Sequence, residues 1–228
     1  MTTATLNPSM AKAPEGTLAP TAVPTMLASG PGTIPPKKAA VLVGLLFLIA
    51  TFTFAIGNAL IHSYFASSTA HNAILVAGVF LLACDGVAVA GNGVVMRRIL
   101  MARTPKRSQA YCAMRVAECL TAVTIGVYFL TSHTQWGGYV LAVYALSGAA
   151  GLILSSALLT SRIVPRNLSM LGVVGYPVFL VGSVLAMFNV IDVTHGAGML
   201  ALVPSGLFEL ALPIRLFTKG FTSERAVA

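Results

Sequence analysis

Charged residues are scarce in this sequence. Lys, Arg, Asp and Glu together make up 9% of the 228 residues, whereas a soluble domain carries roughly 25%. A soluble protein of this length has too large a surface to be covered by so few charges. The same composition excludes disorder for most of the chain, because 57% of the residues are hydrophobic. The class that remains is a polytopic membrane protein.

Cysteines are few, and the motifs of several enzyme classes are missing. Cys84, Cys112 and Cys119 form no CxxC pair and lie in or beside apolar runs, so we interpret them as buried free thiols. The sequence contains no GxSxG, HExxH or GxxxxGK(S/T) motif. We therefore identify no catalytic, cofactor-binding or metal-binding residues, and the sequence favours a protein that is not an enzyme.

Six apolar segments account for most of the chain. Each has about the 20 residues that a helix needs to cross the hydrocarbon core, and none shows the alternating polarity of a barrel strand. Their approximate ranges are 39–61, 72–96, 110–131, 138–159, 168–191 and 198–217. The sequence therefore predicts an all-α fold, a bundle of six transmembrane helices.

The two ends of the chain differ from this bundle. Residues 1–36 hold seven of the twelve prolines, mixed with Ala, Thr, Gly and Ser, and lack helical or strand periodicity. We expect a disordered cytoplasmic tail there. The transmembrane domain is placed at 37–221, and a second short cytoplasmic tail at 222–228.

The basic residues predict the orientation of the bundle. The formal net charge is +8, and the Lys and Arg residues outside the spans flank the bundle or lie in the second and fourth loops. The other three loops contain neither. Basic loops stay in the cytoplasm, so both termini are expected inside. Because no stretch interleaves basic with aromatic residues, we expect no nucleic-acid binding.

Four charged residues lie in the interior of the predicted spans, Asp85, Arg115, Glu118 and Glu209, and Arg215 lies at the basic end of the sixth. A charge in the bilayer centre costs at least about 2.5 kcal/mol, so these residues should face the bundle interior. From a rise of about 1.5 Å per residue, Asp85 lies near mid-membrane, and Glu118 and Glu209 lie roughly 12 Å from the basic ends of their segments. We predict that the four form an intramembrane polar site. Three carboxylates and one arginine would leave an excess negative charge, so at least one carboxyl should be protonated near neutral pH.

This site leaves three interpretations open. In the first, the site is the pathway of a small transporter or proton-coupled protein. In the second, it is a pocket for a lipid, a small ligand or the substrate of a membrane-embedded enzyme. In the third, it is an ion-pair network that fixes helix register in a structural or accessory subunit. The expected partners are the lipid bilayer and, for the first two interpretations, a small ligand or a proton.

Two further patterns concern packing and metals. Ser147, Gly151 and Ser155 recur at four-residue spacing, so one helix face is small and lets another helix approach closely. We expect packing within the bundle there, with a homo-oligomer contact as the alternative. The histidines, at 62, 71, 133 and 195, all fall at the outer rim, and no two share a helix turn. We interpret them as solvated loop residues rather than metal ligands.

The order of several motifs resembles a known family. Asp85 in the second segment is followed by an R-x-x-E formed by Arg115 and Glu118, then by a P-R-x-L-x-x-L-G stretch from Pro165, and finally by Glu209 and a K-G-F sequence. Over roughly residues 37–221, this order resembles the bacterial membrane proteins of the domain of unknown function 4386 family. The resemblance implies a six-helix bundle in a bacterial cytoplasmic membrane and a shared site at the charged positions. It implies no activity.

Overall fold

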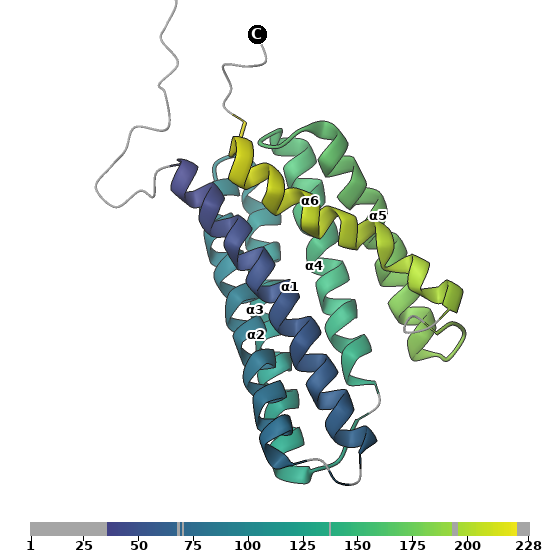
Figure 1. Cartoon of the computed structure of the whole chain (residues 1–228). Helices are drawn as coiled ribbons and strands as arrows, with labels where there is room; N and C mark the ends of the chain where they lie inside the picture. Colours follow the sequence, from purple (N-terminus) through teal and green to yellow (C-terminus); the bar gives the residue numbers. More distant parts are fainter. Residues whose placement is uncertain (1–35, 68, 70, 137, 193–195, 223–228) are drawn as a thin grey trace, which may run out of the picture. The chain divides into compact units, whose positions relative to one another are not determined.

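All six apolar segments form helices in the computed structural model, which describes residues 36–67, 69, 71–136, 138–192 and 196–222 (Figure 1). The helices are α1 (Pro36–Ala66), α2 (Asn72–Leu100), α3 (Pro105–Ser132), α4 (Tyr139–Ser161), α5 (Arg166–Met187) and α6 (Val203–Lys219), with a short 3-10 helix, η1 (Gly196–Ala201), before α6. The described residues contain no strand. The predicted all-α fold is confirmed. The predicted tails at 1–36 and 222–228 lie outside the described residues, apart from Pro36 and Thr222.

The helices have the length and composition of membrane spans. Each of the six, with η1 counted into the last, is long and apolar enough to cross a bilayer. Large apolar side chains point outward on several helices, for example Phe80 and Val87 on α2 and Leu120 on α3. A helix that is apolar on all sides is favoured in lipid or in a protein core. The protein is therefore a multi-pass membrane protein.

The helices form a ring that follows the chain order. Each helix packs against the next one, and α6 returns to pack against α1. The closing contact includes a close approach of the Phe217 ring to Gly44, where an added Cβ would lie 2.9 Å from a ring carbon. Since side chains from every helix of such a ring reach its centre, the fold creates a common interior site.

The small-residue face of α4 lies against α5. A Cβ added at Gly151 would lie 2.1 Å from the Tyr176 ring, and one added at Gly172 would lie 2.7 Å from Ser155. The expected close helix approach is therefore present, and α5 of the same chain covers the face that was the alternative site for a homo-oligomer contact. The third residue of that pattern, Ser147, instead lines the ring's interior.

One end of the bundle carries the basic loops, and we call it the basic end. There, Arg103 Nη1 donates to the carbonyl of Ser161 at 2.7 Å, which places a cation at the negative end of the α4 dipole. The Thr222 N–H donates to the carbonyl of Ile163 at 2.7 Å and ties the segment after α6 to the loop after α4. These contacts hold the start of α3 and the end of α6 against the α4–α5 connection.

Two apolar layers enclose a polar middle. Phe129 and Tyr139 belong to a buried cluster toward the opposite end of the bundle. Tyr111, Phe208 and Leu216 belong to a larger cluster toward the basic end. The predicted charged residues lie between these clusters.

Candidate functional site: a polar cavity at the centre of the ring

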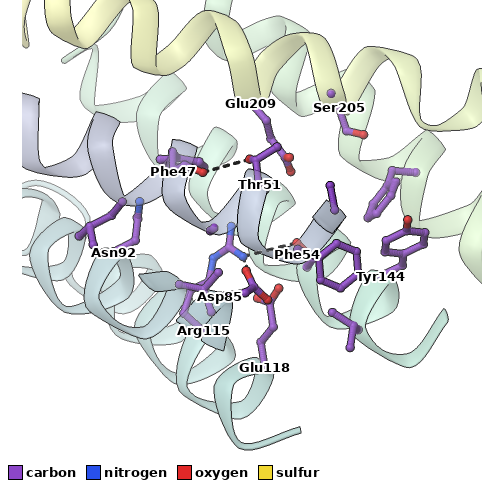
Figure 2. Close-up of a pocket in the computed structure, with 18 of the residues that line it drawn as sticks. Phe47, Thr51, Phe54, Asp85, Asn92, Arg115, Glu118, Tyr144, Ser205 and Glu209 are labelled. Carbon is purple, nitrogen blue, oxygen red and sulfur yellow. Dashed lines mark hydrogen bonds and ion pairs between the residues drawn. The ribbon is translucent and has the colours of Figure 1, made fainter. Parts of the chain in front are cut away.

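The four predicted residues line one cavity. Its volume is about 230 Å³, and side chains from all six helices contribute to its wall. Asp85 reaches it from α2, Arg115 and Glu118 from α3, and Glu209 from α6 (Figure 2). The structure therefore brings together residues that are separated by up to 124 positions in the sequence.

Arg115 and Glu118 form a buried ion pair. Arg115 Nη1 lies 2.7 Å from Glu118 Oε2, and both side chains are about 5% exposed or less. They are three residues apart on α3, a spacing that puts two side chains on the same helix face. Because each charge neutralises the other, the pair needs no further counter-ion.

A second set of hydrogen bonds fixes the orientation of Arg115. Its Nε donates to the Tyr111 hydroxyl at 3.1 Å, and that hydroxyl donates to Asn92 Oδ1 at 2.9 Å. The Asn92 amide in turn donates to the carbonyl of Val43 on α1 at 3.5 Å. This chain of bonds links α3, α2 and α1 and holds the guanidinium toward the cavity. The sequence reasoning did not identify Tyr111 or Asn92.

Asp85 has no such partner. Its side chain is 3% exposed and lines the cavity, yet it forms no hydrogen bond or ion pair with the residues that the structure describes. In Figure 2 its carboxyl group lies beside Arg115 and Glu118. A buried carboxylate without a partner is strongly unfavourable. A proton or a cationic ligand in the cavity would supply that partner.

Glu209 approaches from the other side of the ring. The Tyr176 hydroxyl donates to its Oε1 at 3.3 Å, and the Tyr176 ring is fully buried between Gly151 and Phe208. This bond fixes the carboxyl with respect to α5. Tyr176 was not identified from the sequence, because a tyrosine in an apolar segment has no distinguishing signal.

Aromatic side chains form one wall of the cavity. Phe54 of α1, Tyr144 of α4 and Phe179 of α5 all line it. The Phe54 and Tyr144 ring centroids are 5.7 Å apart, and those of Tyr144 and Phe179 are 5.2 Å apart. We call these three residues the aromatic wall. It was also missed from the sequence, where aromatic residues in apolar runs indicate packing.

The cavity reaches the surface between α1 and α6. Its lining includes the exposed Ala55 and the partly exposed Thr51 on α1, and the partly exposed Leu202 and Gly206 at the start of α6. A Cβ added at Gly206 would meet no heavy atom within 4 Å. The glycine therefore leaves open space beside the cavity, on the side where α6 begins.

The histidines lie away from this cavity. His62, His71 and His133 are exposed, and His133 Nδ1 lies 3.4 Å from the Tyr64 hydroxyl. His195 lies outside the described residues. Among the residues that the structure describes, no three His, Cys, Asp or Glu side chains gather closely enough to hold a metal ion.

Fold and cavity together define a multi-pass membrane protein with an internal polar site. Residues 120–220 match the family model described as domain of unknown function (DUF4386). This match agrees, over that part of the chain, with the resemblance drawn from the sequence. The matched region includes Glu209 but begins two residues after Glu118. No curated protein and no solved structure matches the chain.

Proposed function

We propose that the protein is a small proton-coupled transporter whose solute and proton share the central cavity. The observation that carries this proposal is Asp85, a carboxyl that is buried in the membrane-spanning region, lines a cavity and forms no hydrogen bond or ion pair with any residue that the structure describes. Ionisable residues within spans mark ion and substrate pathways in many membrane proteins. An exchangeable proton or ligand gives such a residue its partner.

The charges of the cavity support this interpretation over a purely structural one. The Arg115–Glu118 pair is neutral by itself, and among the described residues no cation forms an ion pair with Asp85 or Glu209. A network that only fixes helix register would be stabilised by pairing every buried charge. A site whose carboxyls take up and release protons keeps such groups unpaired.

The sixth helix has features of a moving element. Residues Gly196–Ala201 form a 3-10 helix before it, Pro204 begins it, and Pro213 lies inside it. A proline inside a helix removes a backbone hydrogen bond, and interrupted helices line the sites of many transporters. Because Glu209 lies between these two prolines, bending of α6 would move a carboxyl of the site.

We further propose the topology that the basic residues indicate. The basic end faces the cytoplasm of a bacterium, and both termini are inside. The opening between α1 and α6 then lies within the membrane-spanning part of the molecule, where a solute enters from one side or from the lipid.

Reconstitution into liposomes tests this function. Liposomes with a pH-sensitive dye inside receive purified protein, and a small-molecule filtrate of bacterial extract is then added outside. We expect a change of internal pH with the wild type and none with Asp85→Asn. Asp192→Asn is the matched control, since it removes an exposed carboxyl that does not line the cavity. No pH change with the wild type, or an equal change with Asp85→Asn, contradicts the proposal.

A further inference from the structure

The composition of the cavity wall restricts the chemistry of its ligand. Three carboxyls and one arginine line it, and the arginine already contacts Glu118 at 2.7 Å. An anion would meet three carboxyls and an arginine that is already paired, and a neutral solute would leave the proton on Asp85, so its binding would displace no proton. Among the described residues no group is arranged to hold a metal ion. A cation that needs few direct ligands fits the wall best.

The aromatic wall adds a second requirement. Figure 2 shows Phe54 and Tyr144 at the cavity that Asp85 also lines. Phe179 lines the same cavity. Aromatic faces attract ammonium groups, and sites for quaternary ammonium ligands combine such faces with a nearby negative charge. A hydrated metal ion gains little from this surface, whereas an organic cation gains from both the carboxyl and the rings.

The size of the cavity sets an upper limit on the ligand. Pockets for drug-sized molecules occupy about 300–1,000 Å³, and this one has about 230 Å³. A single ammonium group with short apolar substituents suits that space. A lipid would have to leave its acyl chains outside the cavity, in the opening between α1 and α6.

We propose that the cavity binds a small organic monocation, an amine or a quaternary ammonium compound, between Asp85 and the aromatic wall in exchange for one proton. This inference rests on the transport function proposed above and names its substrate class. Without ligand, the Asp85 carboxyl holds the proton. When the cation binds, the proton leaves, and the charge of the site stays the same before and after the exchange.

The other groups around Asp85 are compatible with this exchange. Glu118 and Arg115 of α3 and Glu209 of α6 act on it electrostatically, and Asp85 in turn acts on Cys119 of α3. Tyr144 is the titratable side chain that α4 adds to the lining, and α1 and α5 add none. The Glu118 charge is already compensated by Arg115, and Glu209 accepts a hydrogen bond from Tyr176, so Asp85 is the carboxyl whose proton the ligand replaces most directly.

Calorimetry with the purified full-length protein tests the proposal. The probe is choline, and 3,3-dimethylbutan-1-ol is its uncharged analogue of similar shape. We expect choline to bind with release of about one proton, measured from titrations in buffers of different ionisation enthalpy, and its affinity to rise about tenfold per pH unit while the site is protonated. The uncharged analogue should bind at least about tenfold more weakly. Equal binding of both compounds, or no binding of choline, overturns the proposal.

Two variants separate the site from general folding. Asp85→Asn should abolish choline binding and the linked proton release. Phe54→Leu keeps an apolar side chain but removes a ring, and it should weaken choline binding about tenfold while leaving the analogue unaffected. Phe80→Leu, on the outer face of α2, is the matched control and should bind choline like the wild type. Unchanged binding by both cavity variants overturns the proposal.

This assay also separates the inference from the proposed function. Choline binding with proton release, but no pH change in the liposome assay, supports the cation site and contradicts transport. A pH change with the bacterial filtrate, but no choline binding, supports transport and overturns the organic cation as its substrate.

Discussion

At the scale of single residues, the two buried carboxyls Asp85 and Glu118 differ in what they contact. Glu118 accepts a 2.7 Å hydrogen bond from Arg115, while Asp85 lines the cavity and has no partner among the residues that the structure describes. Removing one member of a buried pair leaves the other charge without its counter-ion. Removing an unpaired carboxyl leaves no charge uncompensated. The same substitution, acid to amide, therefore has opposite consequences for stability at the two positions.

We expect Glu118→Gln to lower the free energy of unfolding by about 3 kcal/mol or more, because Arg115 loses its counter-ion in a low-dielectric site. Asp85→Asn should leave stability unchanged or raise it. Thermal unfolding of the two variants in detergent, beside the wild type, measures both effects. An equal loss of melting temperature in the two variants would mean that Asp85 is also a structural charge.

The charged residues of the site were predictable, but their partners were not. A charge in a membrane span costs free energy, so charged residues there indicate a functional or structural site. This identified Asp85, Arg115, Glu118 and Glu209. Tyr176 is chemically ordinary in an apolar segment, and only the three-dimensional structure shows that it donates to Glu209. The sequence likewise predicted a shared layer for the four charges from their depths, but it could not tell which carboxyl Arg115 pairs with.

At the scale of the helices, the α4–α5 interface depends on small side chains. A Cβ at Gly151 would lie 2.1 Å from the Tyr176 ring, so Gly151→Ala must displace the ring whose hydroxyl contacts Glu209. We expect a loss of about 1–3 kcal/mol from this overpacking, measured as a lower melting temperature. Gly91→Ala is the control: its Cβ would lie 3.7 Å from Leu46, an ordinary contact. A Gly151→Ala variant as stable as the Gly91→Ala variant would contradict this account of the interface.

The start of α6 offers a way to fill the cavity without changing a charge. Gly206 faces open space beside the cavity, so the leucine side chain of Gly206→Leu should occlude the ligand and reduce the liposome signal at least about tenfold. The melting temperature of this variant should stay at or above that of the wild type, because leucine favours a helix more than glycine does. Leu207→Phe, at the exposed neighbouring position, should leave the signal unchanged. Equal signals from the two variants would show that this space is not used.

The helix boundaries show where apolar patterns mislead. The fifth segment was expected to continue to residue 191, but α5 ends at Met187, and Asn189 adopts a positive φ of 57°. Asparagine tolerates this conformation better than most residues. Phe188 and Val190 on either side are apolar, so hydropathy alone gives no signal of the turn.

At the scale of the whole molecule, hydropathy and charge predicted six spans and their alternation, but they did not predict the ring. The helices are apolar on nearly all sides, so their sequences do not indicate which face meets which neighbour. The closure of α6 on α1 depends on particular shapes, such as the Phe217 ring against Gly44. Such a contact has no periodic signature.

The predicted orientation is testable with single cysteines. In a background where Cys84, Cys112 and Cys119 are replaced by alanine, Lys38→Cys reports on the basic end and Thr134→Cys on the opposite end. Both positions are exposed. We expect a membrane-impermeant maleimide to label Thr134→Cys in intact cells and Lys38→Cys only after permeabilisation, as the positive-inside rule requires. The reverse pattern would place the basic end outside.

The most direct test of the central claim combines the cavity, its proton and its cation in one measurement. Liposomes that contain the protein and an acidic interior with a pH-sensitive dye are given choline outside. If choline enters in exchange for protons, the internal pH rises with the wild type and stays constant with Asp85→Asn. A constant internal pH with the wild type, under conditions in which the protein is folded and oriented in the membrane, would contradict the account.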